Sequence, residues 1–220
     1  MNEFSFSVPQ NITVGKGSLT KLPEIAKKSG GSHAFLMSGP HLAKMGLVEK
    51  AANSLKSAGI SVDTFTDIEG NPSVETVDKA TEAFKEAGAD FIVAFGGGSP
   101  MDVAKAVGVT AKYGGSITEY EGAHKVPGPI IPLIAIPTTA GTGSEVTAFS
   151  VITDHSRDYK LTVFSYEILP AYAILDAELL TTAPASVAAA CGIDAFIHAE
   201  EAYISTCLLY TSPSPRDLST

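Results

Sequence analysis

The chain has 220 residues and a formal net charge of −9, with 45% hydrophobic and 18% charged residues. No cluster of lysine or arginine is present, which argues against a nucleic-acid partner, because phosphate backbones attract basic surfaces. The most apolar stretch, residues 129–137, is too short to cross a membrane, and two cysteines are too few for a disulfide framework. We therefore expect a cytoplasmic protein with no nucleic-acid or membrane partner.

Strand and helix patterns alternate along most of the chain. A hairpin is predicted from the alternating runs at residues 4–8 and 11–15, followed by a helix that Ser18 caps and that ends near Lys28. Strands are then predicted at 33–38, 60–66, 89–95, 129–137 and 171–176, helices at 40–59, at 73–88 and after residue 98, and a hairpin at 149–154 and 159–165. Apolar strands between amphipathic helices indicate an α/β fold with a Rossmann-like parallel sheet covered on both faces.

The pattern changes after residue 183. Residues 184–206 are rich in alanine and are predicted to be helical, with Gly192 breaking or kinking the helix. Residues 207–220 have two prolines, many small polar residues and no helical period, so they do not continue it. This segment also resembles a translated sequencing adapter, and we interpret it as a non-native tail.

The string FGGGSPMDVAK, residues 95–105, joins a predicted strand to a predicted helix. Three glycines allow a ligand to approach the backbone, and Ser99 and Pro100 are typical of an N-cap and a first helical position. The free N–H groups and the positive end of such a helix favour an anion, most naturally a pyrophosphate. The alternative is a glycine-rich turn with a structural role only.

Small residues and hydroxyl groups gather in the string IPTTAGTGSE, residues 136–145, again directly after a predicted strand. At the carboxyl edge of an open α/β sheet, such hydroxyl groups are placed to form hydrogen bonds with a cofactor. The alternative is a loop of glycine and threonine that only forms its own turns.

Asp194 and His198 are four residues apart in the string GIDAFIHAEEAYIST, so on a helix both side chains project from one face. A carboxylate and an imidazole together suit a divalent first-row metal. Taken alone, such a pair is more often a surface contact, and two ligands are too few for a tight metal site.

The three strings, with the earlier Asn71-Pro72, resemble the iron-containing (group III) alcohol dehydrogenases in the family's order over residues 1 to about 206. The resemblance implies a dinucleotide-binding domain over residues 1–183 and the start of an all-helical metal-binding domain over residues 184–206. It implies that NAD or NADP and Fe²⁺, with Zn²⁺ as an alternative, bind between the two domains. The implied reaction is hydride transfer between the nicotinamide and a small-molecule alcohol or aldehyde whose oxygen the metal polarises.

The resemblance also assigns site residues. It implies metal ligands at Asp194 and His198, and cofactor contacts at Gly39, Asn71, Gly96, Gly97, Gly98, Ser99, Asp102, Thr138, Thr139, Thr142, Ser144, Lys160 and Leu179. No catalytic acid or base is assigned. The family's two further histidine ligands are absent, so we expect this chain alone to be inactive. The full-length protein is expected to be a homo-oligomer.

Residue 39 is a glycine where NAD-specific members carry an aspartate that binds the adenosine ribose. Without this carboxylate, Ser38 and His41 are expected to accommodate a 2′-phosphate, which favours NADP. The alternative is that Gly39 only forms the turn.

Two other interpretations of the whole chain are open. One is a glycerol dehydrogenase or a dehydroquinate-synthase-like enzyme of the same fold, and the other is a nucleotide-binding module without catalysis. The SPMDVAK sequence after the glycines favours the alcohol dehydrogenases.

Overall fold

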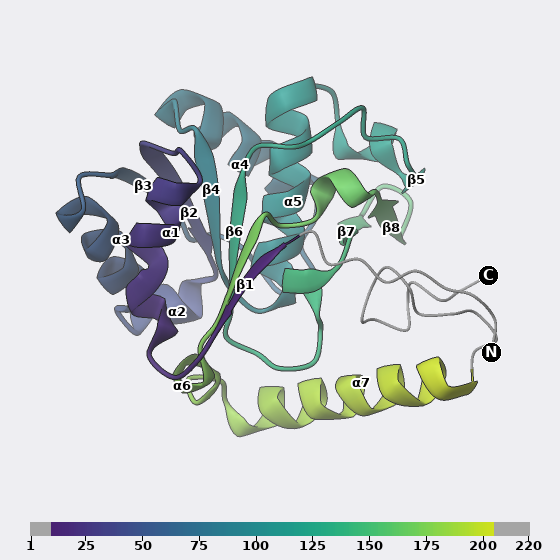
Figure 1. Cartoon of the computed structure of the whole chain (residues 1–220). Coiled ribbons are helices and arrows are strands. Elements are labelled where there is room, and N and C mark those ends of the chain that lie inside the picture. Colours follow the sequence, from purple (N-terminus) through teal and green to yellow (C-terminus); the bar gives the residue numbers. More distant parts are fainter. Residues whose placement is uncertain (1–9, 205–220) are drawn as a thin grey trace, which may run out of the picture.

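The computed structural model describes residues 10–204, and its centre is a six-stranded sheet (Figure 1). The strands lie in the order β1-β9-β6-β4-β2-β3, and all neighbours run parallel. Their bounds are Asn11–Val14 for β1, His33–Ser38 for β2, Ser61–Phe65 for β3, Phe91–Gly96 for β4, Leu133–Pro137 for β6 and Tyr172–Leu175 for β9. The predicted α/β class with a Rossmann-like parallel sheet is confirmed.

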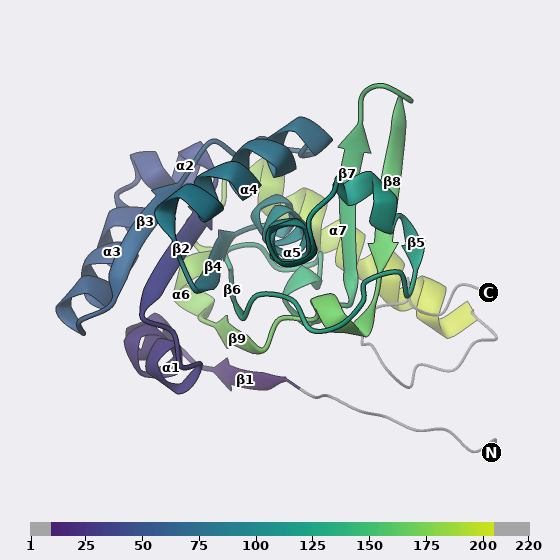
Figure 2. The same cartoon turned by 90° about the horizontal axis from the view of Figure 1, so that it is seen from above.

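Helices cover both faces of this sheet (Figure 2). Helices α1 (Leu22–Lys28) and α3 (Leu47–Ser57) pack on one face, and α4 (Val74–Ala87) and α5 (Gly98–Tyr113) pack on the other. Because both faces are covered, β4 and β6 do not alternate between apolar and polar residues, and every residue of these two strands is buried.

Two separate hydrophobic cores result from this arrangement. Successive residues of a strand point to opposite faces, so Ile92 packs in the core on the side of α4 and α5. Its neighbour Val93 packs in the core on the side of α1 and α3. The sheet is therefore held between two apolar layers, which makes it a rigid platform for the loops at its edge.

A smaller sheet lies beside α5 and has the strand order β5-β8-β7. Its strands are β5 (Gly122–Ala123), β7 (Phe149–Asp154) and β8 (Tyr159–Phe164), and β7 and β8 form the predicted antiparallel hairpin. The remaining elements are α2 (Pro40–Lys44), α6 (Ala177–Leu180), α7 (Ala185–Ile204) and the 3₁₀ helices η1 (Ser18–Lys21), η2 (Ile117–Tyr120), η3 (Ser144–Val146) and η4 (Tyr166–Ile168).

Several predicted elements differ from the observed ones. The single helix predicted over residues 40–59 is two helices, because Gly46 adopts a left-handed conformation with φ of 73° between α2 and α3. Ser18 does not cap a helix: it lies inside η1, and its hydroxyl donates to the carbonyl of Leu175. Helix α7 is not broken at Gly192 and runs continuously through it.

The first strand of the predicted N-terminal hairpin and the tail at 207–220 lie outside the described residues. Within residues 10–204, β1 pairs with β9 in parallel. No helix in this described range is long and apolar enough to cross a membrane.

The winding of the sheet reverses between β2 and β4. Strand β3 follows β2 to one side, whereas β4 lies on the other side of β2. In open α/β sheets ligands bind outside the carboxyl ends of the strands at such a switch point. Helix α7 lies across this end of the sheet (Figure 1).

Candidate functional site

A cavity of about 520 Å³, which we call the glycine pocket, lies at the carboxyl ends of β2, β4 and β6. It lies at the switch point of the sheet, and two residues of α7, Val187 and Cys191, complete its wall. Eight of the predicted cofactor residues line it: Gly39, Gly96, Gly97, Gly98, Ser99, Thr138, Thr139 and Thr142. The structure thus brings together loops that are about 100 residues apart in sequence.

The glycines of this pocket are held by close packing. Gly96 has φ of 156°, and a Cβ there would lie 2.8 Å from the ring of Pro100. A Cβ on Gly97 would lie 3.3 Å from the Thr139 hydroxyl, and one on Gly98 would lie 3.2 Å from the Thr142 methyl group. Side chains at these positions would collide with Pro100 and with the loop after β6, so the glycines allow the turn and this loop to pack closely together.

Helix α5 begins in this turn. Gly97 is its N-cap and makes no side-chain capping bond, so Ser99 and Pro100 are the second and third helical residues and not the cap and first residue as predicted. The first N–H groups of any helix have no partner within it, and the helix dipole places positive charge there. The hydroxyl oxygen of Thr139 is buried in the pocket and has no hydrogen-bond partner among the described residues. Both features fit an anionic ligand such as a pyrophosphate.

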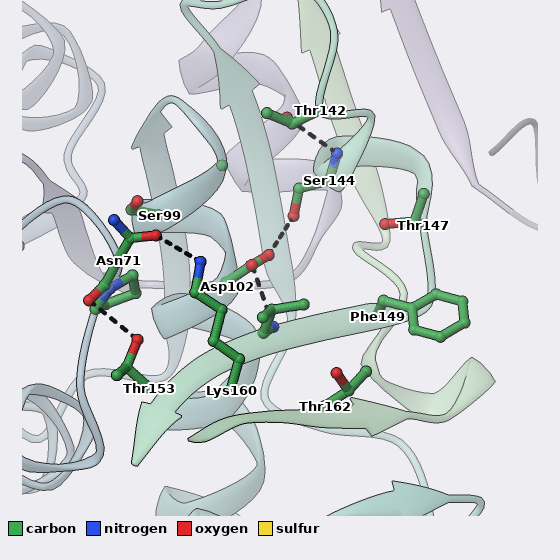
Figure 3. Close-up of a pocket in the computed structure, with 13 residues that line it drawn as sticks. Asn71, Ser99, Asp102, Thr142, Ser144, Thr147, Phe149, Thr153, Lys160 and Thr162 are labelled. Atoms are coloured by element: carbon green, nitrogen blue, oxygen red, sulfur yellow. Dashed lines mark hydrogen bonds between the residues drawn. The ribbon is translucent and has the colours of Figure 1, made fainter. Parts of the chain in front are cut away.

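A second cavity of about 480 Å³, which we call the Asp102 pocket, adjoins the first and shares Gly98, Ser99 and Thr142 with it. In Figure 3, Ser144 points toward Asp102 on one side and Lys160 toward Asn71 on the other. The Asp102 carboxylate accepts hydrogen bonds from the Ser144 hydroxyl at 2.7 Å and from the Val151 N–H at 3.2 Å. Asp102 is therefore fixed in place and joins α5 to the start of β7.

Asn71 and Lys160 form the opposite wall. The ammonium group of Lys160 donates to the side-chain oxygen of Asn71 at 2.9 Å, and both side chains are exposed. Asn71 has φ of 54°, a conformation that asparagine tolerates better than most residues. The N–H of Thr153 donates to the carbonyl of Pro72 at 2.8 Å, which fixes this loop to β7.

Lys105 was not predicted as a site residue, yet it organises this region. Its side chain is fully buried, and its ammonium group donates to the Ser144 hydroxyl at 3.1 Å and to the carbonyls of Thr147 at 2.8 Å and Phe149 at 2.7 Å. A buried charge is tolerated only when such partners surround it. The only feature of the sequence that could have indicated this role is that Lys105 is a charged residue among the apolar residues of a predicted helix.

Glu145 was also missed. One of its carboxylate oxygens is buried with no hydrogen-bond partner among the described residues, in a small cavity that Thr139 also lines. Burial raises the pKa of the Glu145 carboxyl, although its own backbone amide and the charge of Lys105 act against this. The burial favours the neutral acid beside the hydroxyl-rich loop.

The predicted metal ligands lie on α7. The Nε2 atom of His198 is 3.5 Å from a carboxylate oxygen of Asp194, and His198 is buried although most of the helix is exposed. Neither residue lines the glycine pocket or the Asp102 pocket. Among residues 10–204 no group of three or more His, Cys, Asp and Glu side chains is arranged to hold a metal ion. The carboxylate and the imidazole of this pair have the chemistry that suits a divalent metal.

Leu179 is the one predicted cofactor residue that the structure places elsewhere. It is buried in the core beside α1 and α3 and lines a third cavity, of about 270 Å³, which Asp176 also lines and which shares Thr182 with the glycine pocket. Leu179 lies outside the three strings that carry the resemblance to the family, and its assignment was implied by a weaker stretch of that resemblance.

The fold and the glycine pocket define a Rossmann-like α/β domain with a glycine-rich turn at its switch point. The sequence profile described as iron-containing alcohol dehydrogenase matches residues 9–177. The chain therefore belongs to the iron-containing alcohol dehydrogenase family.

Individual relatives agree with this assignment. The chain is 38% identical to the NAD-dependent methanol dehydrogenase of Bacillus methanolicus, over 91% of this chain and 53% of that protein. It is also 38% identical to the NADPH-dependent butanol dehydrogenase of Clostridium saccharobutylicum, over 91% of this chain and 52% of that protein. A crystal structure of 1,3-propanediol oxidoreductase superposes with a TM-score of 0.90 at 36% identity, over 94% of this chain and 55% of that chain. The chain thus spans about half the length of these relatives.

We predict that Lys105→Met destabilises the domain by about 3 kcal/mol, because it leaves buried hydrogen-bond acceptors without their charged donor. Equilibrium unfolding in urea measures the change. Lys79→Met, on the exposed face of α4, is the matched control and should change stability by less than about 0.5 kcal/mol. Equal unfolding midpoints for the two variants would show that the Lys105 ammonium group is not a structural anchor.

Proposed function

We propose that the full-length protein, meaning residues 1–206 joined to a second half of the kind its relatives have, is a metal-dependent alcohol dehydrogenase that uses NAD or NADP. The observation that carries this proposal is the glycine pocket, whose wall combines the turn before α5 with residues of α7. The nucleotide cradle thus adjoins the helix that holds Asp194 and His198. We also propose that α7 starts the second, helical domain.

The residues of the glycine pocket suit the phosphate part of the cofactor. The N–H groups at the start of α5 and the unpartnered Thr139 hydroxyl supply hydrogen-bond donors without any lysine or arginine, which agrees with the acidic composition of the chain. Asp102 does not suit a phosphate, because its charge would repel one. Its carboxylate is better placed to hold Ser144 and to accept a hydrogen bond from a sugar hydroxyl or an amide of the cofactor.

The residues of α7 suit a divalent metal, which we propose to be Fe²⁺, with Zn²⁺ as the alternative. When bound, the nicotinamide accepts or gives the hydride and the metal acts as a Lewis acid toward the alcohol or aldehyde oxygen. Asp194 and His198 would hold this metal on α7, the helix whose Val187 and Cys191 line the glycine pocket. The hydrogen bonds of Lys105 would keep the loop that carries Ser144 and Thr147 rigid.

The names of the relatives favour a small alcohol or aldehyde as substrate, since they include dehydrogenases of methanol, butanol and 1,3-propanediol. Cytoplasmic location and assembly into a homo-oligomer stay predictions from the sequence.

We predict that Asp194→Ala or His198→Ala abolishes metal retention and turnover in the full-length protein, while NADH or NADPH binding stays nearly unchanged. Metal retention should be lost without a loss of nucleotide binding, because the metal and the nucleotide are proposed to contact different segments of the chain. Elemental analysis and a fluorescence titration measure the two properties, with His124→Ala, an exposed histidine elsewhere, as control. An Asp194→Ala enzyme that kept its metal and its rate would refute the ligand assignment.

For this chain alone, we predict nucleotide binding without alcohol oxidation, because the described residues supply only two metal ligands. Alcohol-dependent reduction of NAD⁺ or NADP⁺ is measured against Gly96→Asp, in which the new side chain would collide with Pro100. Activity of residues 1–220 above this control would contradict the prediction.

The choice of nicotinamide depends on residue 39. Gly39 lines the glycine pocket with φ of −90°, and a Cβ there would meet only the carbonyl of Ile68, at 3.4 Å. An aspartate would therefore fit without strain. Ser38 does not take the expected part in phosphate binding, because it is fully buried and donates to the carbonyl of Phe95. His41 is exposed and lines the pocket.

We therefore predict that NADP(H) is accepted at least as well as NAD(H), and that Gly39→Asp shifts the preference toward NAD by roughly 1–3 kcal/mol. The ratio of kcat/KM for the two cofactors measures this shift in the full-length protein. Gly39→Asn, which has the same shape without the charge, should shift the ratio less. Strong NAD selectivity of the wild type, or equal shifts in both variants, would show that charge at residue 39 does not control the choice.

A further inference from the structure

Gly141, in the loop after β6, lies directly against the backbone of α7. It has φ of 146°, a conformation that residues with a side chain rarely adopt. A Cβ at this position would overlap the carbonyl oxygen of Cys191 and would lie 2.9 Å from its carbonyl carbon and 3.2 Å from its Cα. These are backbone atoms of a continuous helix, so a side chain at residue 141 would displace the helix itself.

The contact is made on the face of α7 that carries the proposed metal ligands. Cys191, Asp194 and His198 are spaced by three and four residues, so they lie along one face of the helix. The other side is open, since Ile193 and Phe196 are 64% and 65% exposed. In the described part of the chain, therefore, little contact from that side fixes the helix.

A displacement of α7 at Cys191 would also move the proposed metal ligands, by nearly the same distance. At 1.5 Å per residue, Asp194 and His198 follow Cys191 by roughly 4.5 Å and 10.5 Å along the helix axis. The same loop carries Thr139 and Thr142, which line the glycine pocket. One glycine thus lies between the proposed nucleotide contacts and the proposed metal ligands.

We propose that Gly141 is a positioning residue: its lack of a side chain sets the distance between the glycine pocket and the Asp194–His198 pair. The catalytic consequence of this inference rests on the proposed function, whereas the contact between Gly141 and the backbone of Cys191 is independent of that function. Hydride transfer requires closely aligned reacting atoms, and a misplacement of about 1 Å lowers rates by about 10²-fold.

The test compares Gly141→Ala with two control variants. Gly143→Ala also places a side chain at positive φ, 63°, in the same loop, but its Cβ would meet only the Thr147 methyl group at 3.7 Å. It therefore carries the backbone strain without the collision. Gly192→Ala adds a methyl group next to Cys191 on α7 at a position with no atom within 4 Å.

The first measurement is the rate at which iodoacetamide alkylates Cys191, followed by mass spectrometry of the Cys191 peptide, which separates it from Cys207. The partly buried Cys191 should react severalfold faster in Gly141→Ala, because α7 moves away from the loop. Both controls should react at the wild-type rate. A wild-type rate in Gly141→Ala, or an equal increase in Gly143→Ala, would overturn the proposal.

The second measurement, on the full-length protein, distinguishes an altered position of the metal ligands from a loss of nucleotide or metal binding. Gly141→Ala should lower kcat by roughly 10²-fold, with metal content, melting temperature and the Kd for NADH or NADPH close to wild type. A fall in nucleotide affinity as large as the fall in kcat would overturn the proposal. It would show that the substitution distorts the loop itself and does not act by moving α7 away from it. If the wild type oxidises no alcohol, the proposed function fails, while the alkylation rates still test the contact.

Discussion

The buried ammonium group of Lys105 connects three segments on which the candidate site depends. It joins α5, which carries the glycine turn, to Ser144 in the loop after β6 and to the start of β7. Asp102, one helical turn earlier, accepts from the same serine. A charge so deep in the protein fixes these segments more strictly than apolar packing would, because each donor–acceptor distance must be kept. The residues that Lys105 binds, Ser144, Thr147 and Phe149, all line the Asp102 pocket, so this one side chain fixes much of its wall.

Glycine has the complementary role of allowing segments to approach each other closely. At Gly97 and Gly98 the missing side chains allow two loops to pack against each other, and at Gly141 a loop packs against a helix. The glycines that make residues 95–105 and 136–145 conspicuous in the sequence are thus required by contacts between segments far apart in the chain. Polar anchoring holds the segments, and small residues set how closely they approach.

The elements that the sequence predicted well are those with local causes. Strand β2 was predicted to the residue from its apolar run, and α4 lies between the Ser73 cap and Gly88, as the pattern indicated. The break at Gly46 was missed because the apolar spacing continues across it, and Ser18 was taken for a cap although it bonds to β9. Lys105 and the place of Leu179 depend on contacts between distant segments, which spacing along the chain does not encode.

The buried carboxyl group of Glu145 couples folding to proton uptake. Its pKa in the folded protein is raised above the ordinary value of 4.5, mainly by burial, so the unfolded chain releases this proton at a lower pH than the native protein does. The contribution of this group to stability is complete below about pH 4.5 and is lost as the pH rises through the folded-state pKa. A ligand that offered its unpartnered oxygen a hydrogen-bond donor would favour the carboxylate, so binding of that ligand would release a proton.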